Sequence, residues 1–225
     1  MSEGLQDFDV EEFRLSPSLH GEIKAHQLPP RLAEQEPFIK GPIPFSWVAL
    51  VSRLPGSCLI VAMAIRYLRS RYPWKAGWSI SEIGWRAGLE KQSARRSLRA
   101  LSEAGLISIV WKPGCKPILD ILELNEPEAS RSHPLWGPIP WPWWRAASQL
   151  PGKAPQVALA CWLLAGWERS ARFKLDPVWP ELGLTQVSTY RGRRALVEAG
   201  LVAVTRPRGR TPVVTILDSR SAARS

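Results

Sequence analysis

The sequence has few of the residues from which redox, metal and nucleophilic sites are built. Its 225 residues include only three cysteines and three histidines. Cys58, Cys115 and Cys161 have no Cys-x-x-Cys spacing, so we expect neither a disulfide framework nor a zinc site. The histidines all lie outside the two repeats described below, and none is placed for general base chemistry. We therefore expect no bound metal, no cofactor and no catalytic residue.

Sequence patterns of several other protein classes are also missing. Residues 150–153, Leu-Pro-Gly-Lys, lack the upstream glycine and the Gly-Lys-Ser/Thr ending of a phosphate-binding loop. There is no Gly-x-Ser-x-Gly motif and no His-Glu-x-x-His motif. Apolar runs such as residues 59–65 are too short to cross a bilayer, and the acidic N-terminus has no signal-peptide pattern. We expect a cytoplasmic protein that is not an enzyme and has no membrane partner.

Acidic side chains are scarce beyond residue 39, and this gives the chain its net charge of +10. Residues 1–39 carry 8 acidic and 3 basic side chains, whereas the remainder carries 12 acidic and 27 basic ones. Arginine outnumbers lysine 22 to 8, and the arginine fork pairs well with phosphates and with guanine edges. This concentration of positive charge indicates nucleic acid as the partner.

The chain contains the same pattern twice, at an offset of 95 to 96 residues. A period of that length is too long for a solenoid unit and suits a small domain. Three segments carry the repeat: Gly-Pro-Ile-Pro at 41–44 and 137–140, Leu-Pro-Gly at 54–56 and 150–152, and Arg-Ala-Leu-x-Glu-Ala-Gly-Leu at 99–106 and 194–201.

The repeat predicts two domains, at residues 40–124 and 137–218. Residues 1–39 are acidic and contain prolines, which predicts an arm with little packing of its own. Residues 125–136 are polar and also contain prolines, which predicts a linker. The Ser/Ala/Arg composition of residues 219–225 predicts a flexible tail.

Within each copy, apolar residues first recur at helical spacing, and β-branched and large apolar runs follow. Gly88 and Gly105 are predicted helix stops. We therefore expect a mainly α fold with small β-hairpins, of the α+β class. The predicted helices of the first copy are 45–54, 57–71, 79–87 and 91–104, and its strands are 106–111 and 118–124. The predicted helices of the second copy are 142–150, 154–170, 176–182 and 186–199, and its strands are 201–206 and 212–217.

A short helix, a glycine turn, a longer helix and then a hairpin is the order of a winged helix-turn-helix domain. The chain resembles that superfamily over residues 41–124 and 137–218. Arg-Ala-Leu-x-Glu-Ala-Gly-Leu followed by a β-run is typical of bacterial winged-helix regulators, in which the recognition helix ends at glycine and continues into the wing. The resemblance implies two tandem winged-helix domains that bind DNA.

In the first copy, Ala94, Leu98 and Leu101 share one face of helix 91–104, which should pack on helix 57–71. The other face is cationic and polar. Because an α-helix fits the major groove with its N-terminal residues at the base edges, that face supplies the base-reading candidates. They are Lys91, Gln92, Ser93, Arg95 and Arg96, whereas Arg99 further along is expected to contact phosphate.

The matching helix of the second copy has short polar side chains at its start and arginines behind them. Its DNA-binding candidates are Gln186, Ser188, Thr189, Tyr190, Arg191 and Arg194. Arg193 aligns with the core residue Leu98. Either its aliphatic stem lies along the core with its head in water, or the register slips there by one residue.

The two predicted wings also carry positive charge. Lys112 and Lys116 flank the first turn, and Arg206, Arg208 and Arg210 alternate in the second. Such side chains suit the minor groove or the phosphates beside it. Trp141, Trp143 and Trp144 lie in a Pro-rich stretch at the domain junction, where they could serve as core, as an interdomain contact or as a surface for a protein partner.

These observations predict sequence-specific binding of double-stranded DNA, as expected of a prokaryotic transcriptional regulator associated with the nucleoid. Two alternatives remain open. One is a plasmid or phage replication initiator of the tandem winged-helix type, which would bind arrays of direct repeats. The other is a winged-helix adaptor that docks a protein through the acidic arm or the junction tryptophans.

Overall fold

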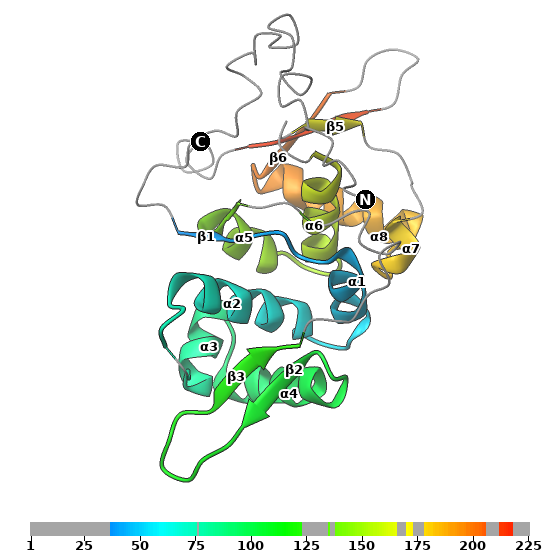
Figure 1. Ribbon diagram of the computed structural model, residues 1–225. Coiled ribbons are helices and arrows are strands. Elements are labelled where there is room, and N and C mark those ends of the chain that lie inside the picture. The colour runs from blue at the N-terminus through cyan, green and yellow to red at the C-terminus, as the bar shows by residue number, and fades with distance from the viewer. Residues whose placement is uncertain are drawn as a thin grey trace, which may run out of the picture. The chain divides into compact units, whose positions relative to one another are not determined.

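Helices and short antiparallel sheets alternate along the chain, giving the α+β class that the sequence predicts (Figure 1). The computed structural model describes residues 37–75, 77–122, 135, 138–165, 170–172, 178–205 and 212–217. These residues belong to one compact unit, Leu32–Ser225. Most of the predicted arm and linker, the second turn with Arg206, Arg208 and Arg210, and the tail lie outside the described residues.

The helices and strands of the first copy form where the sequence predicts them. The Ser79 hydroxyl accepts a hydrogen bond from the Glu82 amide at 3.1 Å and caps α3. Gly88 ends the same helix with a positive φ of 68°, a conformation that glycine adopts without strain. The elements are α1 (Phe45–Arg53), α2 (Cys58–Arg71), α3 (Ile80–Ala87), α4 (Lys91–Glu103), β2 (Ile107–Val110) and β3 (Ile118–Ile121).

Helix α2 is the centre of this copy and is buried on nearly every side of its first half. Ala94, Leu98 and Leu101 of α4 are all buried, and α4 packs against α2. The predicted packing of the cationic helix is therefore confirmed. β2 and β3 form an antiparallel hairpin in which Ile107 lies opposite Ile121.

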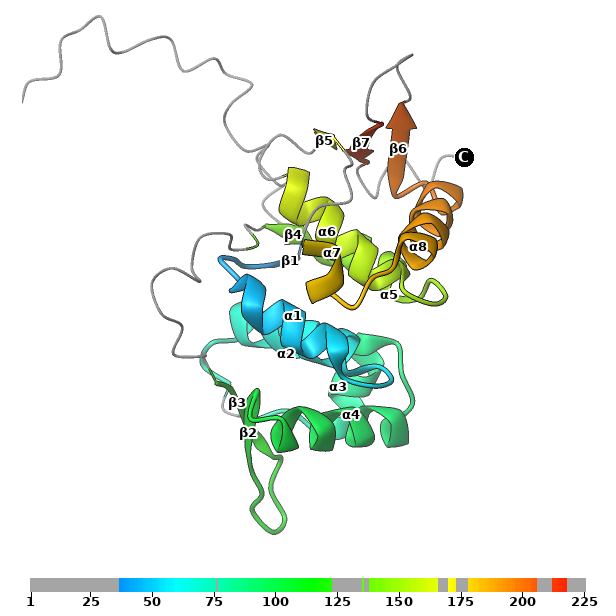
Figure 2. The same ribbon diagram turned by 90° about the vertical axis from the view of Figure 1, so that its right-hand side faces the viewer.

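The second copy follows the same order with two differences. The predicted helix 154–170 is too long, because α6 ends at Ala165 and Ser170–Arg172 form strand β5 instead. β5 pairs with β7, so this copy has a three-stranded sheet in the order β5-β7-β6 (Figure 2). Helix α7 has only four residues. The elements are α5 (Trp141–Ser148), α6 (Ala154–Ala165), α7 (Val178–Glu181), α8 (Gln186–Glu198), β6 (Val202–Thr205) and β7 (Val213–Ile216).

Helix α8 packs closely on α6 because it carries a glycine at the contact. A Cβ atom on Gly192 would lie 2.7 Å from Val157 Cγ2 and 3.2 Å from Ala154 Cα. The buried residues Thr189, Gly192 and Leu196 of α8 match Ala94, Ser97 and Leu101 of α4. The register of α8 therefore does not slip. Arg193 is half-buried, and its guanidinium lies 5.7 Å from the centre of the Tyr190 ring.

Two-residue strands join the copies to each other, and the sequence did not predict them. β1 (Phe38–Ile39) pairs antiparallel with β4 (Ile139–Pro140), and Ile43 forms a bridge with Leu135. Ile39 and Leu135 are buried, although the sequence placed them in the arm and in the linker. Chain that was expected to lie outside the two domains therefore belongs to the core.

The junction tryptophans are core residues, which corrects the alternative that they offer a surface to a protein partner. Trp141, Trp143 and Trp144 are all buried. The Trp141 ring stacks on Tyr67 of the first copy, with ring centres 4.1 Å apart and planes 15° apart. Trp143 Nε1 donates to the Leu201 carbonyl at 3.1 Å. No helix among the described residues combines the length and apolarity needed to cross a membrane.

We predict that Gly192→Ala destabilises the protein. Overpacking costs about 1–3 kcal/mol, whereas alanine in a helix gains only about 0.5–1 kcal/mol over glycine. Urea unfolding followed by circular dichroism should show a lower midpoint. Val187→Ala, on the exposed side of the same helix, is the control and should change stability by about 0.5 kcal/mol or less. A Gly192→Ala protein as stable as the parent would contradict the close contact of α6 and α8.

Candidate nucleic-acid interface

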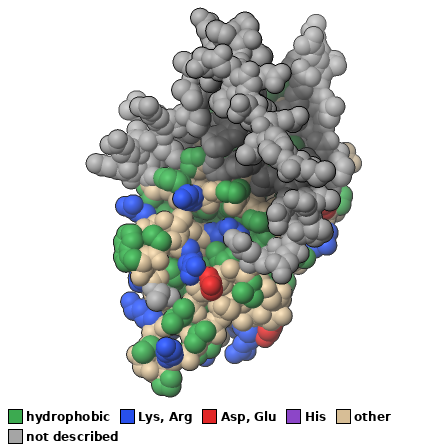
Figure 3. Space-filling model, in the orientation of Figure 1, with side chains coloured by type: hydrophobic (Ala, Val, Ile, Leu, Met, Phe, Trp, Pro, Cys, Tyr) green, Lys and Arg blue, Asp and Glu red, His purple; other side chains and the backbone are tan. Residues whose placement is uncertain are grey.

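The outer face of α4 is cationic from Lys91 to Arg99 and ends at the acidic Glu103. The apolar residues of the helix and Ser97 recur at helical spacing and are buried, so the opposite positions face solvent. Figure 3 shows Lys and Arg side chains spread over the lower part of that view, which is the first copy, with few acidic side chains among them. Ser93 is half-buried, and the exposed residues of α4 are Lys91, Gln92, Arg95, Arg96, Arg99 and, at its last turn, Glu103.

Among the described residues, the arginines of this face have no acidic partner. Within the described part of the chain, no ion pair or side-chain hydrogen bond engages Arg95, Arg96 or Arg99. Glu103 follows Arg99 at the four-residue spacing that favours a pair on a helix, yet none forms. Three guanidinium groups are therefore available to an external anion.

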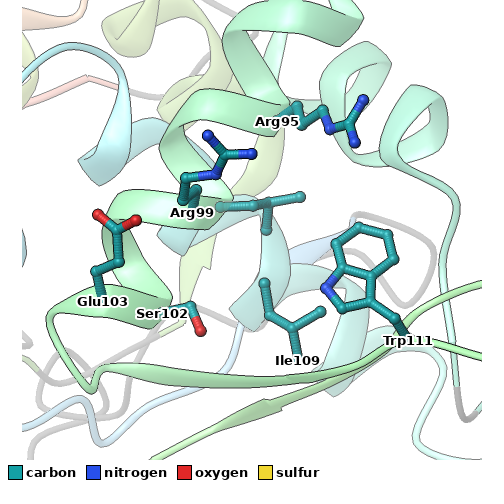
Figure 4. A pocket seen from close by; sticks show the side chains of 7 residues that line it. Arg95, Arg99, Ser102, Glu103, Ile109 and Trp111 are labelled. Atoms are coloured by element: carbon teal, nitrogen blue, oxygen red, sulfur yellow. The ribbon is translucent and has the colours of Figure 1, made fainter.

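A groove of about 390 Å³ separates α4 from the hairpin. Arg95 and Arg99 line it from the helix, and Ile109 and Trp111 line it from the strand side (Figure 4). The Trp111 ring is 55% exposed although it is large and apolar. Trp111 is not among the DNA-binding candidates predicted from the sequence. The alternation of a strand would have revealed it, because Ile109 and Trp111, two residues apart, share one face.

The hairpin turn presents its two lysines to solvent, as expected for the first wing. Lys112 and Lys116 are both exposed, and the turn is closed by a hydrogen bond from the Cys115 amide to the Lys112 carbonyl at 3.1 Å. Gly114 adopts a φ of 71° in this turn. These lysines, the groove and the α4 arginines together form what we call the first cationic surface.

Helix α8 presents a similar but weaker surface. A groove of about 580 Å³ runs along it, with Tyr190 and Arg191 in its lining. Arg194 forms an ion pair with Glu198 at 2.7 Å, and this hydrogen bond raises the pKa of the guanidinium. The ion pair with Glu198 must therefore break before all the donor groups of the Arg194 guanidinium can bind a phosphate. The exposed candidates of this helix are Gln186, Tyr190, Arg191 and Arg194.

Two predicted DNA-binding residues of α8 have structural roles. Thr189 is only 3% exposed, because it occupies the position that Ala94 holds in α4. The Ser188 hydroxyl accepts from the Thr185 amide at 2.8 Å, and Thr185 Oγ1 accepts from the Ser188 amide at 3.2 Å. This capping box fixes the start of α8. Burial contradicts the prediction that Thr189 contacts DNA, whereas Ser188 stays a predicted DNA-binding residue that also caps the helix.

The three cysteines differ sharply in their surroundings. Burial raises the pKa of the Cys161 thiol to about 12 and also raises the pKa of Cys58. Cys115 is exposed at the hairpin turn. Among the described residues, no three His, Cys, Asp or Glu side chains gather as a metal site would require.

We predict that one thiol reacts in the folded protein. Thiolate is the nucleophile, so groups with raised pKa stay protonated and inert near pH 8. Ellman's reagent at pH 8 should modify Cys115 rapidly, and all three cysteines after unfolding in guanidinium chloride. A Cys115→Ser variant, the control, should show no fast phase. A second fast thiol in the folded protein would contradict the burial of Cys58 and Cys161.

Comparisons with known proteins return no relative on which a function could be based. No family model matches the chain, and neither a curated protein nor a solved structure matches it. What the chain does must therefore be inferred from its own residues, and above all from the first cationic surface.

Proposed function

We propose that the chain binds double-stranded DNA through two tandem winged-helix domains. In this proposal α4 and α8 are the recognition helices, and the hairpins β2–β3 and β6–β7 are the wings. The observation that carries the proposal is the first cationic surface. There Arg95, Arg96 and Arg99 are exposed beside a hairpin, and none of the three has an acidic partner among the described residues.

The chemistry of this surface suits a duplex. The N-terminal half of α4 carries a lysine, a glutamine and two arginines, side chains that match the hydrogen-bonding edges of guanine and adenine in the major groove. Arg99 lies later on the helix and suits a phosphate. Trp111 supplies an apolar surface between the helix and the two lysines, where a sugar–phosphate backbone would pass.

Regulation of transcription is the role that this arrangement fits best. Each copy offers its own reading helix, and the two helices carry different residues at their exposed positions. Because both are in one chain, binding of one raises the effective concentration of the other at a neighbouring half-site. A long composite site can then be selected from many competing sequences.

We predict that Arg95→Ala with Arg96→Ala abolishes site preference without unfolding the protein. A bidentate contact to a base contributes about 1–3 kcal/mol of discrimination, so the double variant should lose tenfold or more in specific affinity. Fluorescence anisotropy with a selected duplex, together with footprinting, measures this. Lys40→Ala with Arg71→Ala removes the same charge from exposed positions outside α4 and should keep the footprint. An unchanged footprint in the α4 variant would show that α4 does not read DNA.

We also predict a steep dependence of DNA affinity on salt. If about 6–10 cationic side chains meet phosphates, the binding constant should fall by about 10³–10⁵ between 50 and 200 mM salt. Anisotropy titrations at several salt concentrations give the slope. An adaptor without a DNA role would instead elute early from heparin and bind random duplex too weakly to titrate.

A further inference from the structure

The strand contacts between the two copies are reciprocal. Ile39 lies opposite Ile139, and Ile43 lies opposite Leu135. At the repeat offset of 96, Leu135 is the counterpart of Ile39, and Ile139 is the counterpart of Ile43. If the two copies are exchanged, the contact between Ile39 and Ile139 therefore becomes the contact between Leu135 and Ile43.

A second set of contacts repeats this reciprocity in different elements. Arg53 at the end of α1 donates from Nε to the carbonyl of Glu181, the last residue of α7, at 3.1 Å. Gln149, the counterpart of Arg53, donates from Nε2 to the carbonyl of Ala87, the last residue of α3, at 3.2 Å. Each copy thus binds the end of the third helix of the other copy.

Reciprocal contacts of this kind arise from a two-fold axis. In an isologous interface, residue i contacts j and j contacts i, whereas copies related by translation make unlike contacts head to tail. The two copies are therefore related by an approximate two-fold rotation. Both views place β2–β3 and β6–β7 at opposite ends of the unit, an arrangement that such a rotation allows (Figures 1 and 2).

We infer that the chain recognises an imperfect inverted repeat in duplex DNA, with α4 reading one half-site and α8 the other half-site in the opposite direction. The inference rests on the proposed function. A duplex carries two-fold axes perpendicular to its length, and a two-fold pair of readers matches sites that are inverted about such an axis. A direct repeat would need two readers related by translation.

The residues of the two helices indicate how alike the half-sites are. Arg96 and Arg191 are counterparts at the repeat offset of 95, so both halves should carry guanine at the dyad-related positions they meet. Arg95 corresponds to Tyr190, and Lys91 corresponds to Gln186. The bases at those positions should differ between the halves, and this makes the inverted repeat imperfect.

Selection of bound duplexes from a random library, with the full chain and sequencing of what is retained, tests this inference. The expected motif contains two related half-sites in inverted orientation. A motif built of direct repeats, or of a single half-site, would overturn the inference while leaving DNA binding intact. Failure to enrich any duplex would overturn the proposed function itself.

A second measurement tests the orientation directly. One half of the selected site is reversed at unchanged centre-to-centre spacing, and the affinities of the inverted and direct probes are compared by anisotropy. We expect the direct probe to bind about tenfold more weakly or worse, because mismatched base pairs each cost about 1–3 kcal/mol. Equal or tighter binding of the direct probe would overturn the inference.

Single variants then assign each half-site to its helix. Arg96→Ala should relax preference in one half only, and Arg191→Ala in the other half only. Arg71→Ala, an exposed arginine outside both helices, should leave both halves unchanged. If the Arg96 and Arg191 variants relaxed the same half, the two helices would not read opposite halves and the inference would fail.

Discussion

The reciprocal contact between the two copies is the constraint on which the rest of the structure depends. Its strands are only two residues long, so a few backbone hydrogen bonds and the packing around them determine how the copies meet. Ile39, Ile43, Leu135 and Ile139 are all buried there, and buried backbone groups must find partners. The stacked rings of Tyr67 and Trp141 add a further contact between the two copies. Since α2 carries Tyr67 and also supports α4, the contact that joins the copies also positions the cationic helix.

Much of each copy could be predicted from the sequence because its determinants are local. Helix α3 begins at a serine cap and ends at a glycine with positive φ, and the apolar spacing of α4 predicts which face is buried. The strands β1, β4 and β5 could not be predicted in this way. They exist because a distant segment pairs with them, and segments of two or three residues carry no period of their own.

The candidate interface was predictable to a similar degree and for similar reasons. Periodicity identified the exposed residues of α4. The repeat offset that aligns the two helices also aligns Thr189 with the buried Ala94, so the burial of Thr189 could have been predicted although the residue is among the DNA-binding candidates. Sequence spacing could not show which arginines are paired. Arg99 and Arg194 precede a glutamate by the same four residues, and only Arg194 forms the ion pair. Rotamers and neighbouring side chains decide such pairing. Arg99 of α4 and Arg194 of α8 therefore differ in whether an ion pair holds them, although their sequence spacing to a glutamate is the same.

The matched strand and hydrogen-bond contacts also bear on how such a chain arises. Two separate polypeptides with one copy each could form the same contacts as a homodimer. In a homodimer every substitution appears on both subunits at once. Fusion of the two genes removes that coupling while the partner stays covalently attached. Lysine can then stand at position 91 while glutamine stands at position 186.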